Sequence, residues 1–153
     1  MSTRIFLLSP AHCGGLRAQL VLRKQARFDL ARRVQSAQGA PLGEVFSFMS
    51  GLYFRGKLAY ARSFARPPAG VNGTLVITPC QGFQPPQTQV GATLLRRYGR
   101  VDIDPDDPRY RRPLVRDARA LAAALDTAAG WQVVLLGSVA SGKYVEPLTQ
   151  VFG

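Results

Sequence analysis

"VVLLGSVASGKYVEPL", residues 133–148, joins two features that decide the fold: an apolar run of strand-forming residues and a glycine-rich turn directly after it. The spacing from Gly137 to Gly142 and Lys143 matches the G-x-x-x-x-G-K pattern of loops that bind nucleotide phosphates. Such a loop holds Mg²⁺ through a Ser or Thr directly after the lysine, and Tyr144 stands there instead. Only ten residues follow Lys143, too few for the acid-bearing strand that completes the metal site. We therefore interpret the stretch as a buried strand that ends in a turn.

Two more apolar runs, RIFLL at 4–8 and TLVIT at 74–78, resemble the run at 133–137. A strand that is apolar at every position, and not at alternate ones, is typical of a parallel sheet covered on both faces. Apolar residues with helical spacing lie between these runs, at 16–34, 44–65, 90–98 and 113–129. The alternation of strands and helices predicts an α/β fold, a three-layer sandwich with a mostly parallel sheet of at least three strands.

We expect one domain over residues 1–153, because the chain contains no repeat, low-complexity tail or linker. The sequence stops directly after the apolar residues Val151 and Phe152, so whether Gly153 is the natural end stays open. No apolar run approaches the length that spans a bilayer, and we predict no membrane association. Two cysteines are too few for a disulfide framework, which favours a reduced, cytoplasmic setting.

The balance of charge is strongly positive. The chain has 20 Lys and Arg against 9 Asp and Glu, a formal net charge of +11. Such a field attracts polyanions, so we expect as partner a nucleic acid, a nucleotide or a phosphorylated small molecule. Seventeen of the 20 cations are Arg, beside abundant Ala, Gly and Pro. A GC-rich genome produces the same composition, and this second explanation of the arginine excess stays open. The oligomeric state is not predicted.

Small and polar residues follow the three predicted strands, and ligands of open parallel sheets bind beyond the carboxyl ends of strands. Both cysteines and the single histidine lie within five residues of such an end. The candidate catalytic residues are Ser9, His12, Cys13 and Cys80. A Cys80–His12 pair would supply a nucleophile and its base. A zinc site is a second alternative, although no spacing motif supports it, and we predict neither a metal nor another cofactor. In the third alternative the thiols are small buried groups and His12 is a surface or capping group.

The candidate ligand-binding residues come from two parts of the chain. The first set follows the strands and consists of Thr78, Gly137, Ser138 and Lys143. We expect the glycine-rich turn and Lys143 to bind phosphate through backbone N–H groups at a helix start. The second set is Arg55, Lys57 and Arg62, which alternate with aromatic residues in the predicted helix 44–65. Aromatic and basic side chains together form stacking and phosphate-binding surfaces. At helical spacing, the aromatic residues also fit a role in the core.

Three stretches occur in an order found in a known group of proteins: LYFRGKLAYARSFA at 52–65, TLVITPCQGFQPPQTQV at 74–90, and 133–148. This order resembles bacterial α/β domains related to the peroxide-stress family YaaA, whose first strand ends in Ser-Pro, as at Ser9-Pro10. The lysine that some relatives carry soon afterwards is absent, and His12-Cys13-Gly14 stands there. The resemblance implies an α/β fold and a link to nucleic acids or nucleotides, without an agreed reaction.

These observations favour a nucleic-acid- or nucleotide-binding α/β domain with a ligand cleft at the carboxyl ends of the strands. The alternative is a small enzyme that acts on a nucleotide-like or other anionic substrate through Cys, His or Ser at those ends. A redox-sensing role for the thiols also stays open.

Overall fold

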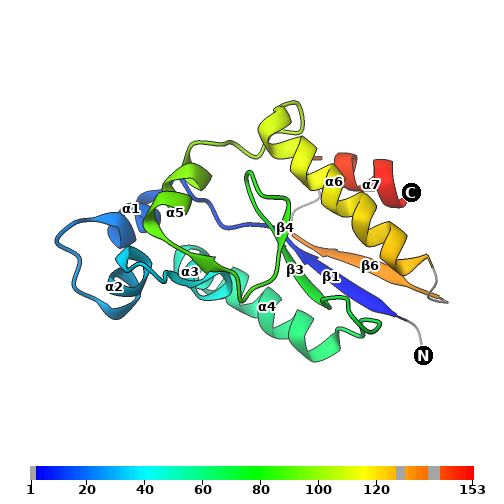
Figure 1. The fold of residues 1–153 in the computed structure, drawn as a ribbon, viewed down its shortest axis with the longest axis horizontal. Coiled ribbons are helices and arrows are strands. Elements are labelled where there is room, and N and C mark those ends of the chain that lie inside the picture. Colours follow the sequence, from blue (N-terminus) through cyan, green and yellow to red (C-terminus); the bar gives the residue numbers. More distant parts are fainter. Residues whose placement is uncertain (1–2, 127–129, 138–141) are drawn as a thin grey trace.

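The computed structural model describes residues 3–126, 130–137 and 142–153 (Figure 1). The helices are α1 (Leu16–Leu22), α2 (Asp29–Gln35), α3 (Leu42–Ser50), α4 (Leu52–Phe64), α5 (Ala92–Gly99), α6 (Pro108–Leu125) and α7 (Val145–Phe152). The strands are β1 (Arg4–Leu8), β2 (Ala40–Pro41), β3 (Thr74–Ile77), β4 (Phe83–Gln84), β5 (Gln89–Val90) and β6 (Gln132–Leu136).

The main sheet has four strands in the order β4-β3-β1-β6. β1 pairs in parallel with β3 on one side and with β6 on the other. β4 pairs with β3 in the antiparallel direction at the edge, and β2 and β5 form a separate two-stranded sheet. The prediction that the three apolar runs are parallel strands of one sheet is confirmed, and the fold is α/β with a mostly parallel sheet.

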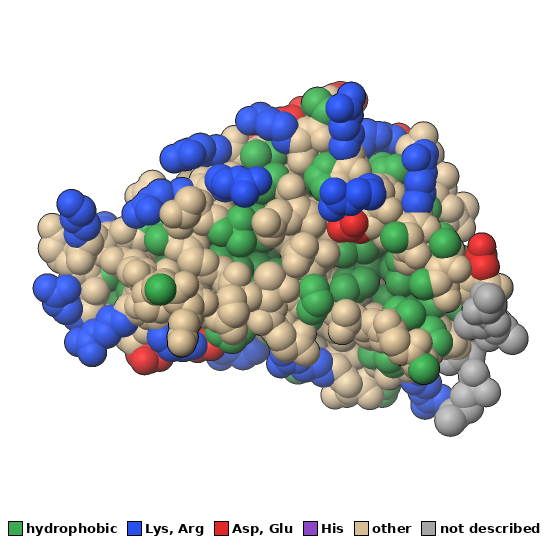
Figure 2. Space-filling model, viewed as in Figure 1, with side chains coloured by type: hydrophobic (Ala, Val, Ile, Leu, Met, Phe, Trp, Pro, Cys, Tyr) green, Lys and Arg blue, Asp and Glu red, His purple; other side chains and the backbone are tan. Residues whose placement is uncertain are grey.

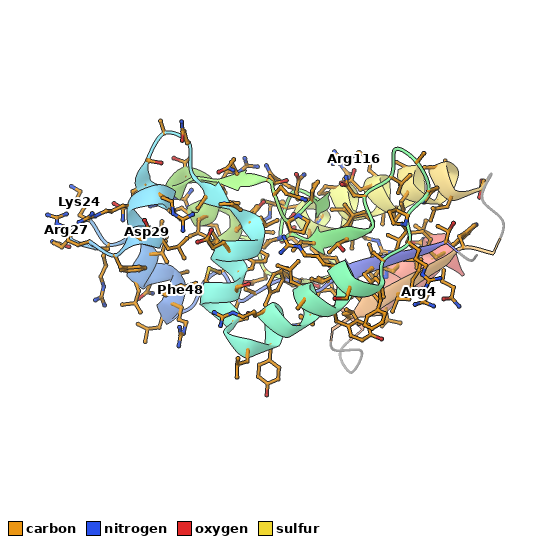
Figure 3. All side chains as sticks on the ribbon, turned by 90° about the horizontal axis from the view of Figure 1, so that it is seen from below. Arg4, Lys24, Arg27, Asp29, Phe48 and Arg116 are labelled. Carbon is orange, nitrogen blue, oxygen red and sulfur yellow. The ribbon has the colours of Figure 1, made fainter. Side chains whose placement is uncertain are left out.

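Alternate residues of β1 enter two separate hydrophobic clusters. Phe6 and Leu8 pack with residues from α1 to α5, whereas Ile5 and Leu7 pack with residues of α6 and α7. Figures 1 and 3 show α4 and α6 on opposite sides of the strands. Because both faces of β1 are covered, residues 5–8 are all apolar and buried, and the sequence shows no alternation.

The expected helix 44–65 is two helices in the structure. α3 ends and α4 begins at Gly51, whose backbone has φ +61° and ψ −132°. A residue with a side chain is strained in this conformation, so the break depends on glycine. The expected helical stretch at 16–34 is likewise two helices, α1 and α2.

Helix α6 begins five residues earlier than expected. The helical spacing at 113–129 predicted a start at Pro113, but α6 starts at Pro108 and Pro113 lies inside it. The reason is a local cap: the Asp107 carboxylate accepts a hydrogen bond from the Arg109 N–H, and proline suits the first helical position. This earlier start adds a turn of helix that carries arginines toward the sheet edge.

Candidate functional site

The carboxyl ends of β1, β3 and β6 lie at one edge of the sheet because the three strands are parallel. Ser9 follows β1, Thr78 follows β3 and Gly137 follows β6. The Ser9 N–H donates to the Leu136 carbonyl oxygen at 3.1 Å, which ties the ends of β1 and β6 together. The predicted gathering of strand ends is therefore present in the backbone, and the side chains decide which of them meet.

Ser9 contacts Lys57 of α4, 48 residues away in the sequence. The Lys57 Nζ donates to the Ser9 Oγ at 2.7 Å and to the Ser9 carbonyl oxygen at 3.3 Å. Ser9 is 6% exposed and Gly137 lies against its Oγ so closely that a side chain at Gly137 would clash. Within the described residues Lys57 has no ion pair with a carboxylate, and it lies 5.6 Å from the Phe54 ring centroid. Burial lowers the pKa of Lys57, because a charged amine loses water there.

The two thiols have different surroundings. Cys13 is buried and donates weakly to the Ala11 carbonyl oxygen, and its pKa is raised to about 12 by burial and by the nearby Cys80. Cys80 is half-buried and lines the same cavity as Arg97. Burial raises the pKa of Cys80, and Arg97 and Arg109 oppose that shift. Neither thiol is therefore a thiolate near neutral pH.

His12 is exposed, and its ring lies against the backbone of Gly14 and Gly15. Among the described residues no hydrogen bond joins His12 to Cys80, and the charged groups near Cys80 are Arg97 and Arg109. The structure thus gives Cys80 a cationic neighbour where the sequence suggested a histidine.

A cavity of about 680 Å³ opens beside Cys80, between α5, the loop after it and the first half of α6. Its lining is Cys80, Arg97, Arg100, Val101, Arg109, Arg112, Pro113 and Arg116. Five of these eight residues are arginine and none is acidic, so we refer to it as the arginine pocket. Figure 2 shows Lys and Arg side chains gathered along the border of the molecule that carries α5 and the start of α6.

Two of the five pocket arginines are partly neutralised. Arg109 pairs with Asp107 at 2.7 Å and Arg116 pairs with Asp117 at 3.0 Å. The remaining three, Arg97, Arg100 and Arg112, form no ion pair with a carboxylate in the described part of the chain. Three guanidinium groups with free donors around one cavity favour an anion with several oxygen acceptors.

The sequence contains one signal for the arginine pocket, a row of arginines that becomes visible when the helix is taken to begin at Pro108. Arg109, Arg112 and Arg116 have the spacing i, i+3, i+7, which places them on one face of α6. The helix expected at 113–129 contains only Arg116 of these three, so the row is not visible from that prediction. Arg97 and Arg100, at the end of α5, come from another element, and no pattern in the sequence brings them to α6.

The predicted ligand-binding residues that the structure describes have different surroundings. The Thr78 hydroxyl donates to the Gly82 carbonyl oxygen and accepts from the Gln81 N–H, so both contacts stabilise its own turn. The carbonyl of Lys143 accepts from the Tyr110 hydroxyl at 2.9 Å. Ser138 lies outside the described residues. Tyr144, which replaces the magnesium-binding Ser or Thr of a phosphate loop, is buried beside Tyr110.

The three predicted basic residues of α4 diverge around the helix. Lys57 reaches Ser9, whereas Arg55 and Arg62 line the side of a second cavity, of about 720 Å³, between α3 and α4. This cavity also contains Glu44, which is already bound by Arg33. Arg55 and Arg62 are exposed and form no ion pair with a described carboxylate.

Comparison of the chain with family models, curated proteins and solved structures finds no match. The likeness to the YaaA-related domains therefore stays a prediction. Within the described residues no helix is long and apolar enough to cross a membrane. The same residues include no group of three or more His, Cys, Asp or Glu placed to hold a metal ion.

Proposed function

We propose that this chain is a three-layer α/β domain that binds a phosphate-bearing ligand, a nucleotide or a nucleic acid, in the arginine pocket. The observation that carries the proposal is the convergence of five arginines from α5, α6 and the loop between them on one cavity beyond β3. Ligands of parallel α/β sheets bind beyond the carboxyl ends of strands, where this cavity opens next to Cys80. A formal net charge of +11 attracts the same ligands from a distance.

The pocket chemistry favours phosphate over a single carboxylate. Guanidinium groups donate in a fork that fits two oxygens of a phosphate, and three of them here lack a carboxylate partner among the described residues. A cavity of about 680 Å³ is in the range of small-molecule sites, so it has room for a nucleotide. The Cys80 thiol at its wall is uncharged near neutral pH, because burial raises its pKa, and does not repel an anion.

The direct test is titration calorimetry with inorganic pyrophosphate, a nucleoside triphosphate and a mixed oligonucleotide, each at several salt concentrations. The double variant Arg97→Gln/Arg112→Gln removes two of the unpaired arginines. We expect its affinity to fall at least about tenfold, since a hydrogen bond to a charged group is worth roughly 1.5–3 kcal/mol. Binding of an oligonucleotide should also weaken steeply with added salt.

The control variant is Lys24→Gln/Arg27→Gln, which removes the same charge from the connection between α1 and α2. Figure 3 shows Lys24 and Arg27 at the left end of the molecule, away from Arg116. Their loss should leave pyrophosphate affinity nearly unchanged. An equal loss in both variants would mean that net charge alone attracts the ligand. Absence of binding at low salt would leave genome composition as the explanation of the arginines.

A second candidate function, hydrolysis of an ester or amide, is favoured by one contact, the 2.7 Å hydrogen bond from Lys57 Nζ to Ser9 Oγ. A lysine whose pKa is lowered by burial is easier to deprotonate, and the neutral amine accepts the proton of a serine hydroxyl. The Ser9 oxygen would then bond to the carbonyl carbon, and the leaving group would take its proton from Lys57. Water would release the acyl group by the reverse sequence of proton transfers.

A fluorophosphonate probe tests this candidate without knowledge of a substrate. Labelling mapped to Ser9 by mass spectrometry, and abolished by Lys57→Met, would support it. In that reaction the Ser9 oxygen displaces fluoride and Lys57 takes the proton. If a folded protein stays unlabelled over the range from pH 7 to about pH 10, Lys57 serves only to hold the end of β1.

A further inference from the structure

Helix α4 exposes large apolar side chains that the core does not use. Tyr53 is 85% exposed, Leu52 81%, Tyr60 52% and Phe64 46%. The side of the helix that faces the core is formed by Phe54, Leu58 and Ala61, which are buried. An exposed aromatic cluster of this size on one helix usually marks a contact with a partner.

The exposed side of α4 is ordered in three rows. Opposite the buried side lie small residues, Gly56, Ala59 and Ser63, and a side chain added at Gly56 would meet nothing within 4 Å. Helical geometry places Tyr53 and Tyr60 along one border of this row, since they are seven residues, two turns, apart. The same spacing places Arg55 and Arg62 along the other border. We call these seven residues the outer face of α4.

The charge of α4 restricts the kind of partner. The helix contains Arg55, Lys57 and Arg62 and no acidic residue. Lys57 is directed to Ser9, so two cations with no carboxylate partner in the described chain remain at the surface. Glu44 is the acid in the cavity beside them, and Arg33 holds it with two hydrogen bonds. The outer face is therefore cationic and aromatic, complementary to a polyanion that exposes flat apolar groups.

We propose that the outer face of α4 binds single-stranded nucleic acid, with bases stacked on Tyr53 and Tyr60 and phosphates paired with Arg55 and Arg62. The inference rests on the proposed function only in requiring a nucleic acid as ligand, and it uses a surface separate from the arginine pocket. Exposed bases distinguish a single strand from a duplex, in which the bases are already stacked on one another.

The geometry of the rows fits this ligand. Seven residues of helix span about 10.5 Å, so Tyr53 and Tyr60 are spaced to receive bases that are not adjacent in one stack. Tyr60 packs against Phe64, with ring centroids 4.6 Å apart, and makes a T-shaped contact with Phe6, with ring centroids 5.7 Å apart. A ring fixed in this way loses little conformational entropy when a base stacks on its free side. The row of small residues leaves room for the sugar-phosphate chain between the borders.

The experiment measures fluorescence anisotropy of a labelled mixed-sequence single strand of about 20 nucleotides, and of the same sequence as a duplex, at low salt. Tyr53 is the position to change, because it is largely exposed and its loss leaves the fold intact. Tyr53→Leu keeps apolar area but removes the ring, and we expect about tenfold weaker binding of the single strand. Tyr53→Phe should retain the affinity, and Arg55→Gln/Arg62→Gln should weaken binding and flatten its salt dependence.

Leu52→Ala is the matched control, since Leu52 is as exposed as Tyr53 but has no ring, and it should bind like the wild type. Equal affinity of Tyr53→Leu and the wild type, or equal binding of duplex and single strand, would overturn the inference. Pyrophosphate binding by all α4 variants reports on the arginine pocket separately. If the wild type binds pyrophosphate but no oligonucleotide, the inference about this surface is rejected alone. If the wild type binds neither ligand, the proposed function is rejected too.

Discussion

Gly51 separates α3 from α4 and has a backbone conformation in which a residue with a side chain is strained. Its φ of +61° and ψ of −132° belong to a region that glycine alone occupies without strain. No other atom lies within 4 Å of the position a side chain would take, so space around Gly51 is not the constraint. The angle between the two helices, and with it the direction of the outer face of α4, depends on this one residue.

The variant Gly51→Ala should therefore lose stability, by about 1–3 kcal/mol. Gly56→Ala is a matched control, because Gly56 also has open space around it but lies inside α4. Alanine is favoured over glycine in a helix interior, so Gly56→Ala should gain up to about 1 kcal/mol. Urea unfolding followed by circular dichroism measures both. Two variants that change stability in the same direction would refute a backbone origin of the break.

Helix α6 depends on its first turn both for its start and for the arginine pocket. The Asp107 carboxylate accepts from the Arg109 N–H at 2.9 Å and also pairs with the Arg109 guanidinium. Both contacts hold the pKa of Asp107 below its ordinary value, the side-chain contact with Arg109 first. The cap thus places Arg109 at the rim of the pocket.

The lowered pKa of Asp107 predicts how stability depends on pH. The unfolded carboxyl binds its proton at a higher pH, near about 3.9, than the folded one. The contribution of Asp107 is therefore complete above that pH and is lost as pH falls through the lower, folded value. Asp107→Asn keeps an oxygen for the cap but does not titrate, so its stability should fall less between pH 5 and pH 2. Parallel acid-denaturation curves for the two proteins would contradict this.

The whole molecule is organised around one sheet with a hydrophobic cluster on each face. Trp131, the single tryptophan, packs with the cluster of α6 and α7 and lies 6.3 Å from the Phe152 ring. Cys13 belongs to the cluster on the opposite face. Since neighbouring residues of β1 alternate between the two clusters, neither cluster can be lost without exposing the strand that supports the other.

We expect the 153-residue chain to unfold in one cooperative transition. Trp131 fluorescence reports on the cluster of α6 and α7. The rate at which a thiol reagent labels Cys13, measured in a Cys80→Ser background at each urea concentration, reports on the cluster on the opposite face. The urea midpoints of these two signals should coincide. A transition of Trp131 that clearly precedes or follows exposure of Cys13 would indicate two independently folding units.

Much of this fold was accessible from local patterns. The continuous apolar runs at 4–8 and 74–78 predicted buried strands, and both are strands to within one residue. Their parallel direction followed from the helical spacing between them. The position of the strand-end residues was also predictable, because parallel strands bring their carboxyl ends to one edge. These properties depend on neighbouring residues, whose spacing the sequence displays directly.

Contacts between distant elements depended on tertiary packing. Nothing in the sequence joins Ser9 to Lys57, 48 residues away, or Arg97 of α5 to Arg112 of α6 around Cys80. The sequence likewise grouped Arg55, Lys57 and Arg62 of α4 into one predicted surface. In the structure Lys57 contacts Ser9 at the sheet edge, whereas Arg55 lines a different cavity. The type and burial of each element follow from the periodicity of its own side chains. Which side chains share a cavity is decided by how helices rotate and cross on the sheet, and that depends on packing across the whole core.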